Sequence, residues 1–277
     1  MNYRNSTTIS YNNENNFNIM SPYIKAIYDY FSKYQKYIKN ITIRHSNQYS
    51  LIKLHVSDIP KIDIKDIEKI EKIKLKSFWI NSSVVYGKQY FWYDFEVNNT
   101  LYKSIITPVN FFQINRFLFE TLYNTVIQEF EPFQKYHLIG FGDDTPNVIL
   151  PILKEYKIKE LDVFVHYESN ITNLYLNLLK NKLPIEQFRG KLESEFDIDD
   201  KEYVLICNPG RKGLSENICK KINESNIKAI LYMSCKPVSF ERDQKRLDTY
   251  NLKKKYNYNF FEGSIGYLET LNILEKK

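Results

Sequence analysis

The pattern of hydrophobic and polar positions divides the chain into two parts. After Ser21-Pro22, which suits a helix cap and a first-turn proline, apolar residues recur at helical spacing to about Lys39. Beyond this helix, apolar and polar residues alternate, which is typical of half-buried strands. The predicted strands are 41–44, 50–56, 77–86 and 89–97, with a helix at 65–73. This pattern predicts a small α+β domain over residues 21–105, preceded by a flexible, asparagine-rich tail over residues 1–20.

The second part, residues 106–277, has a different pattern, in which short apolar runs alternate with longer helix-like segments. The apolar runs are 136–140, 161–165, 203–207 and 229–233. Alternation of this kind predicts parallel strands joined by crossover helices, and hence an α/β, doubly wound, Rossmann-like domain. In such a domain, ligands bind at the carboxyl ends of the strands.

Composition limits the classes of protein to which the chain can belong. A length of 277 residues with 43% hydrophobic residues suits one large domain with a smaller attachment. No apolar run is long enough to span a membrane and the N-terminus has no signal-peptide core, so we expect a cytoplasmic protein without membrane association. The three cysteines and four histidines fit neither a disulfide framework nor a metal-ligand cluster, so no metal is expected.

The net charge of +6 and the pI near 8.9 are compatible with an anionic partner such as nucleic acid. Compositional bias towards lysine and asparagine explains the same charge equally well. One segment, Lys253-Lys254-Lys255 followed by Tyr256 and Tyr258, combines positive charge with rings that could stack on bases. A solvated loop is the simpler interpretation of this segment, and it is the one we favour.

One cysteine stands where α/β enzymes present a nucleophile. Residues 231–243 read LYMSCKPVSFERD, so an apolar run brings Cys235 to a strand end, with a proline and charged residues beyond it. A cysteine without such a context is more often a small buried hydrophobic residue. The surroundings of Cys235 in the sequence favour a nucleophile.

Four segments together resemble a known family of enzymes. They are FFQIN at 111–115, NPGRKGL at 208–214, SCKP at 234–237 with Arg242-Asp243 beyond it, and GYLE at 266–269. Their order and spacing resemble the RNA uracil-C5 methyltransferases, most closely the tRNA (uracil-5-)-methyltransferases, over most of residues 24–277. The resemblance implies a class I methyltransferase fold, S-adenosylmethionine as cofactor, and tRNA or another structured RNA as partner. We expect the protein to act as a monomer.

The resemblance implies a covalent mechanism that agrees with the chemistry of uracil. C5 of uracil is too weak a nucleophile to take a methyl group from a sulfonium donor unless a thiolate first adds at C6. A general base must then remove the C5 proton before the thiolate leaves. The resemblance assigns the thiolate to Cys235 and the base to Glu269.

The resemblance also implies which residues bind the two ligands. It gives the cofactor-binding residues as Gln113, Gly140, Gly142, Glu168 and Asn208, and the substrate-binding residues as Phe111, Arg211, Arg242 and Asp243. From the residues alone, Gln113 also suits a helix cap, and Glu168 suits the start of a helix. Gly140 and Gly142 equally suit a turn that binds nothing.

Four positions depart from the pattern of the family. Asp144 stands where the glycine-rich turn has another glycine, and Asn208 replaces an aspartate. Gly210 replaces a proline, and Tyr267 replaces a histidine. These changes leave an alternative open, in which a catalytically inactive relative binds RNA or a protein partner and has an eroded cofactor pocket. Affinity for S-adenosylmethionine distinguishes the two functions.

Overall fold

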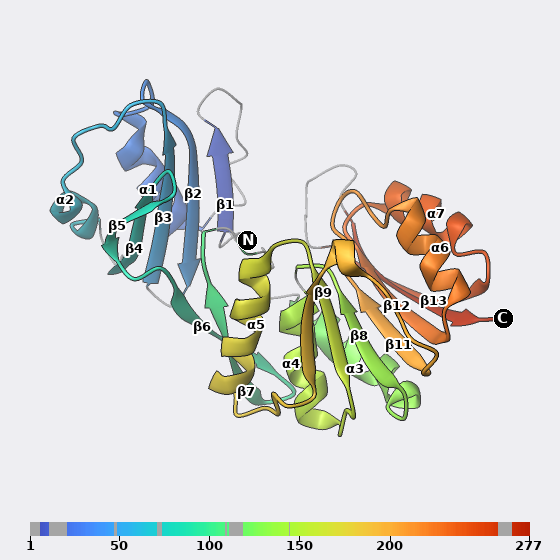
Figure 1. The fold of residues 1–277 in the computed structure, drawn as a ribbon. Helices are drawn as coiled ribbons and strands as arrows, with labels where there is room; N and C mark the ends of the chain where they lie inside the picture. The colour runs from blue at the N-terminus through green and yellow to red at the C-terminus, as the bar shows by residue number, and fades with distance from the viewer. Residues whose placement is uncertain are drawn as a thin grey trace. The chain divides into compact units, whose positions relative to one another are not determined.

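A computed structural model (Figure 1) describes residues 6–10, 21–46, 49–70, 74–108, 110, 119–143, 145–259 and 268–277. The chain forms two compact units. The first comprises Met1–Asp94 and Ser104–Phe117, and the second comprises Phe95–Lys103 and Leu118–Lys277. The chain passes from the first unit to the second and back again within the hairpin of β6 (Phe91–Val97) and β7 (Thr100–Ile106). This hairpin lies close to the domain boundary predicted at residue 105.

The first unit is a five-stranded sheet with two helices. The strands, in spatial order, are β1 (Ser6–Ser10), β2 (Ile38–Ser46), β3 (Tyr49–Val56), β4 (Lys74–Ile80) and β5 (Ser83–Gly87). All neighbours are antiparallel except β3 and β4, which are parallel. The helices are α1 (Pro22–Ser32) and α2 (Ile64–Glu68). This mixed arrangement is the predicted α+β class.

The start of α1 follows the sequence prediction closely. The Ser21 hydroxyl accepts a hydrogen bond from the Ile24 N–H at 3.4 Å, and Pro22 occupies the first turn. Several details differ from prediction. The helix expected to run to about Lys39 ends at Ser32, and β2 begins at Ile38. The helix expected over 65–73 is α2, which ends at Glu68. Residues 6–10, expected in a flexible tail, pair with β2 as the strand β1. The single strand predicted over 77–86 is broken at Asn81, which has φ of 53° and turns the chain between β4 and β5.

The second unit is built on a seven-stranded sheet with the order β10-β9-β8-β11-β12-β14-β13. The strands are β8 (His137–Phe141), β9 (Leu161–Val165), β10 (Phe188–Leu192), β11 (Tyr203–Cys207), β12 (Ile227–Ser234), β13 (Tyr250–Tyr258) and β14 (Glu269–Lys276). The first five are parallel to one another, whereas β14 runs antiparallel to both β12 and β13. The predicted α/β, doubly wound, Rossmann-like architecture is confirmed by this strand order.

In the described part of this unit, the helices α3 to α7 accompany the sheet (Figure 1). They are α3 (Phe119–Phe130), α4 (Thr145–Glu155), α5 (Glu168–Lys180), α6 (Glu216–Glu224) and α7 (Pro237–Arg246). The crossovers through α4 and α5 proceed from β8 towards β10, and the crossover through α6 proceeds the other way, from β11 to β12. Because such crossovers are right-handed, these two sets of helices cover opposite faces of the sheet.

The reversal of direction between β8 and β11 is the topological switch point of the sheet. The two strands are directly paired, with Phe141 opposite Cys207 at their carboxyl ends. Ligand sites of doubly wound sheets form at this point. We therefore expect the functional site among the residues that follow β8, β9, β11 and β12 and at the start of the antiparallel β14.

The four apolar runs predicted as parallel strands are confirmed, with ends that shift by at most a few residues. The prediction of a solvated loop around Lys253–Lys255 was wrong, because this segment forms the edge strand β13. The Lys254 ammonium and the Tyr256 hydroxyl both bind the Glu129 carboxylate of α3, at 2.9 and 2.6 Å. These two side chains thus join the edge strand to a helix, and lysines on an edge also discourage pairing with another chain.

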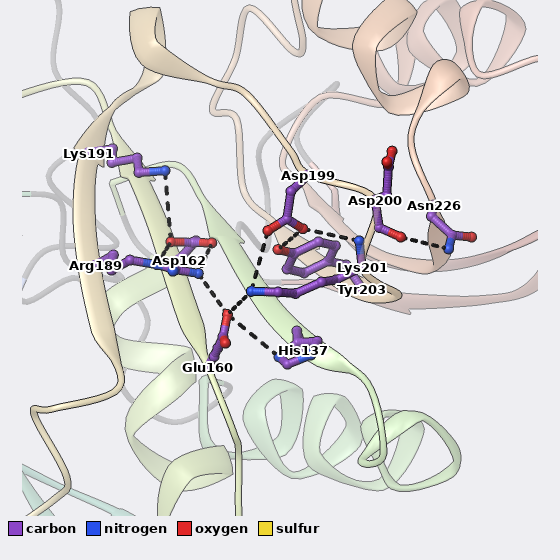
Figure 2. A network of polar contacts seen from close by, with 10 residues as sticks. All are labelled: His137, Glu160, Asp162, Arg189, Lys191, Asp199, Asp200, Lys201, Tyr203 and Asn226. Carbon is purple, nitrogen blue, oxygen red and sulfur yellow. Dashed lines mark hydrogen bonds and ion pairs between the residues drawn. The ribbon is translucent and has the colours of Figure 1, made fainter.

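A polar network lies at the amino ends of β8 to β11, the edge opposite the switch point (Figure 2). At its centre the Arg189 guanidinium binds both oxygens of the Asp162 carboxylate, at 2.7 and 2.9 Å, and reaches Glu160 at 2.9 Å. Lys201 binds Glu160 at 2.7 Å, and the Tyr203 hydroxyl binds Asp199 at 2.7 Å. The network holds the first residues of adjacent parallel strands together.

We expect Arg189→Ala to lower the free energy of unfolding by about 1–3 kcal/mol, because the buried Asp162 carboxylate would lose both of its hydrogen bonds to the guanidinium. Lys201→Ala is the matched control, since its partners Glu160 and Asp199 are more exposed and we expect a loss below about 1 kcal/mol. Urea denaturation measures both values. Equal losses in the two variants would contradict a central role for the Arg189–Asp162 pair.

Within the described ranges, no helix is both long and apolar enough to cross a membrane. The same residues contain no cluster of histidine, cysteine and carboxylate side chains that could hold a metal ion.

Candidate active site

Cys235 and Glu269 come together through the pairing of β12 with β14. Ser234, the last residue of β12, lies opposite Thr270, and the Thr270 hydroxyl donates to the Ser234 carbonyl at 3.3 Å. Cys235 follows Ser234 and Glu269 precedes Thr270, so the antiparallel register sets the two residues side by side at the carboxyl edge of the parallel strands. The Glu269 side chain is buried, with 2% of the residue exposed, whereas Cys235 is half-buried.

Opposing charges act on the Cys235 thiol. Burial raises its pKa, and the nearby Glu269 carboxylate raises it further. The Arg211 guanidinium lowers it, through its positive charge and a hydrogen bond to the sulfur. Cys235 also lies immediately before Lys236, the N-cap of α7, and a helix amino end favours a thiolate.

Cys235 is the accessible thiol of the three in the chain. Cys207 and Cys219 are fully buried, and burial raises the pKa of Cys219 to about 12 and that of Cys207 well above its ordinary range. In contrast to Cys235, neither thiol has its pKa lowered by a hydrogen bond from an arginine side chain. Accessibility and the effect of Arg211 on the thiol pKa therefore both distinguish Cys235 from the other two cysteines.

The turn after β8 is held very close to the end of β11. Gly142 has φ of +104°, and a Cβ atom there would lie 2.1 Å from the Asn208 carbonyl oxygen. The Gly142 N–H donates to Phe164 and the Asn208 N–H donates to Phe141, each at 2.8 Å. Gly142 is thus required by the approach of the two strand ends. Gly140 is buried inside β8, between its neighbours on β9 and β11.

Asp143, the first of the two aspartates in this turn, bonds within the protein. Its Oδ1 accepts from the His166 N–H at 3.0 Å and from the Asn170 side-chain amide at 2.7 Å. These bonds tie the turn to the end of β9 and to α5. The second aspartate, Asp144, lies outside the described residues.

A cavity of about 330 Å³ opens between the end of β9, the segment after β10 and the start of α6. It is lined by His166, Glu193, Ser194, Phe196, Ser215, Asn217, Ile218 and Lys221. His166 Nδ1 lies 3.7 Å from a Glu193 carboxylate oxygen. Burial raises the pKa of Glu193, as does the charge of Asp143, and His166 opposes the shift. Glu168 is absent from this lining and stands exposed in the first turn of α5.

The remaining predicted residues near Cys235 occupy different environments. Asn208 is buried at the end of β11, and Arg211 is exposed in the loop that follows. Asp243 has no exposed surface, and both of its carboxylate oxygens bond within the protein, one of them to Arg242. Asp243 therefore has no face to offer to RNA in this structure. Three predicted positions, Phe111, Gln113 and Tyr267, lie outside the described residues.

Sequence reasoning missed several residues of this region. The lining residues Glu193 and Ser194 were missed because they follow β10, whose polar sequence FRGKL did not predict a strand. His166 directly follows an apolar run, and this position at a strand end could have indicated a residue of the site. Tyr232, which bonds to Asp243, was hidden inside the apolar run that precedes Cys235.

Known proteins resemble this chain in sequence and in fold. An uncharacterized RNA methyltransferase of Fusobacterium nucleatum is 27% identical over 266 residues, covering 87% of this chain and 56% of that protein. A 23S rRNA (uracil(747)-C(5))-methyltransferase of Shewanella putrefaciens is 28% identical over 182 residues, covering 62% and 44%. The chain spans about half the length of these curated relatives. No family model matches it.

The solved structure of a Pyrococcus abyssi tRNA (uracil-54, C5)-methyltransferase in complex with S-adenosyl-L-homocysteine has the same fold. It superposes with a TM-score of 0.72 at 16% identity, covering 99% of this chain and 75% of that one. The resemblance of the four sequence segments thus agrees with the relatives found by sequence and with the order of strands in the sheet. The chain is thus similar in sequence to RNA methyltransferases, among them uracil-C5 methyltransferases, and shares its fold with one of the latter.

Proposed function

We propose that the protein methylates C5 of a uridine in RNA, using S-adenosylmethionine as methyl donor and Cys235 as a transient covalent nucleophile. The observation that carries this proposal is the adjacency of Cys235 and Glu269 at the carboxyl edge of the sheet, with Arg211 at the sulfur. Uracil C5 methylation requires one nucleophile and one base on the same ring, and this pair supplies both.

Cys235 adds to C6 of the uracil as a thiolate, which gives C5 the electron density of an enolate. The Arg211 charge favours this thiolate, and the half-buried position leaves the sulfur open to a base that has been turned out of its stack. The addition forms a carbon–sulfur bond at C6. That bond breaks again in the last step, when the C5–C6 double bond is restored and the thiolate leaves.

Glu269 removes the proton from C5 once the methyl group is in place. Its carboxylate is buried beside the sulfur, so the uracil ring bound to Cys235 lies within its reach. Proton removal at C5 and departure of the thiolate at C6 occur on neighbouring carbons. The adjacent strand ends of β12 and β14 match this geometry.

The residues at the switch point fit the adenosine part of S-adenosylmethionine, which supplies the methyl group when bound. The cavity of about 330 Å³ beside the ends of β9 and β10 has room for an adenine or a ribose, and His166, Glu193 and Ser194 offer polar groups. Asp143 is engaged with His166 and Asn170, so its carboxylate does not stand free in the turn. We infer that Gly140, Gly142 and Asn208 form the surface along which the cofactor binds. Gln113 and Glu168 are further candidates for contact with the cofactor.

The RNA substrate is the less specified part of the proposal. The sequence motifs led us to expect a tRNA substrate, whereas a relative found by sequence is a 23S rRNA (uracil(747)-C(5))-methyltransferase. Arg211, Arg242 and Phe111 are candidates for contact with the RNA. The assay should therefore offer both tRNA and an rRNA fragment containing a uridine loop.

The proposed function predicts that the purified protein forms 5-methyluridine in one of these RNAs when S-adenosylmethionine is supplied. Nuclease digestion and mass spectrometry detect the product, and calorimetry with S-adenosylmethionine alone measures cofactor binding. We expect saturable cofactor binding and product formation. Absence of cofactor binding would overturn the proposal and favour the inactive relative, which binds RNA or protein with an eroded pocket.

A further inference from the structure

A fully buried carboxylate, Asp243 of α7, joins the loop 208–214 to the strand that leads to Cys235. Its Oδ2 accepts hydrogen bonds from the Leu214 N–H at 2.6 Å and from the Tyr232 hydroxyl at 2.7 Å. Tyr232 lies in β12 and is itself fully buried. One oxygen therefore connects the loop, the helix after Cys235 and the strand before it. Hydrogen bonds to a buried charge are short and strong, so they define a single arrangement.

Further bonds from α7 hold the backbone of the same loop. The Arg242 guanidinium binds the other oxygen of Asp243 at 2.7 and 2.9 Å and donates to the Lys212 carbonyl at 2.6 Å. The Ser239 hydroxyl donates to the Arg211 carbonyl at 2.8 Å. The loop backbone is thus fixed at Arg211 and at the residues that follow it.

Gly213 shows how closely the loop fits against the carboxylate. It has φ of +69°, and a Cβ atom at this position would lie 2.2 Å from Asp243 Oδ2. The loop backbone therefore passes directly over the carboxylate, with no room for a side chain between them. The position of the Arg211 side chain follows from this backbone path.

We propose that Asp243 and Tyr232 are positioning residues, which hold the loop 208–214 so that the Arg211 guanidinium stays beside the Cys235 sulfur. Two charged groups and burial then act on the thiol: Arg211 favours the thiolate, whereas Glu269 and burial oppose it. A loop that moved away would remove the Arg211 charge, which opposes Glu269 and burial. The importance of this arrangement for catalysis rests on the proposed function, but the arrangement itself can be tested without RNA or cofactor.

The test measures how alkylation of Cys235 by iodoacetamide depends on pH, using the full chain and mass spectrometry of the peptide that contains Cys235. Only the thiolate reacts, so the midpoint of the profile reports the thiol pKa. Tyr232→Phe removes the hydrogen bond but keeps the ring. We expect its profile to shift to higher pH, with alkylation at pH 7.5 about three- to ten-fold slower relative to its plateau.

A double variant makes this expectation specific. In an Arg211→Gln background the Tyr232→Phe change should produce no further shift, because the group that it positions is already gone. Tyr203→Phe is the matched control, since Tyr203 is also buried and donates to a carboxylate, that of Asp199, but at the opposite edge of the sheet. It should leave the profile unchanged.

Two results would overturn the proposal. One is an equal shift from Tyr232→Phe in the presence and absence of Arg211, and the other is an unshifted profile in a Tyr232→Phe protein that retains its circular dichroism spectrum. Both are independent of methyl transfer. Failure of the positioning proposal would leave the proposed function standing, and an inactive enzyme with the expected shift would overturn only the proposed function.

Discussion

Replacing Cys235 with alanine should abolish methyl transfer. Without a thiolate at C6, C5 of uracil keeps its low nucleophilicity, so we expect a loss of roughly 10⁴-fold or more in turnover. The covalent protein–RNA adduct should disappear with it. The half-buried position of Cys235 makes the substitution mild for the fold, and RNA binding should persist. Transfer of a labelled methyl group to RNA measures the first effect, and denaturing gel electrophoresis of the protein–RNA mixture measures the second.

Cys219→Ala is the control for this variant. Cys219 is a buried thiol of α6 that belongs to the hydrophobic core, away from the surface that Cys235 offers. Its removal should leave turnover within a few-fold of the native value. If Cys235→Ala retained the activity of Cys219→Ala, no covalent mechanism through Cys235 could operate.

Replacing Glu269 with glutamine should separate the two halves of the reaction. Glutamine keeps the shape of the side chain but cannot accept the C5 proton, so we expect turnover to fall roughly 10²- to 10⁴-fold. Loss of the negative charge beside Cys235 removes one cause of its raised pKa, and the thiolate therefore forms at lower pH. Adduct formation should persist while release fails, so the protein–RNA adduct accumulates.

Glu275→Gln provides the comparison, because Glu275 lies further along the same strand, opposite Ala229. It should neither slow turnover nor trap an adduct. A Glu269→Gln enzyme that lost turnover without accumulating adduct would show that Glu269 acts before or during addition at C6, and would contradict its role as the base at C5.

The sequence predicted four of the strands that are buried on both faces, but it did not predict β14, which is also largely buried. The strands β8, β9, β11 and β12 are continuous apolar runs because helices cover both sides of the sheet at those positions. The strands β10 and β13 were not predicted, because they lie at the two ends of the sheet and carry charged residues such as Arg189 and Lys254. Their polarity reflects position in the sheet, which no local pattern reveals.

The candidate site was predicted in part, for a similar reason. The adjacency of Cys235 and Glu269 depends on the register of β12 with β14, a long-range pairing that periodicity cannot supply. The resemblance to a family named both residues, and the structure adds their adjacency. Asp243 was expected to contact the substrate because the resemblance to the family implied it. Its burial under Leu214 and Tyr232 appears only in three dimensions.

The most direct test of covalent catalysis by Cys235 uses RNA in which the target uridine carries fluorine at C5. The fluorine takes the place of the proton that Glu269 would remove, so the thiolate cannot leave after methyl transfer and the adduct persists. Proteolysis and mass spectrometry then identify the modified residue. The account predicts a methylated fluorouridine attached to the peptide that contains Cys235. Formation of 5-methyluridine on ordinary RNA, with no adduct at Cys235 on the fluorinated RNA, would contradict it.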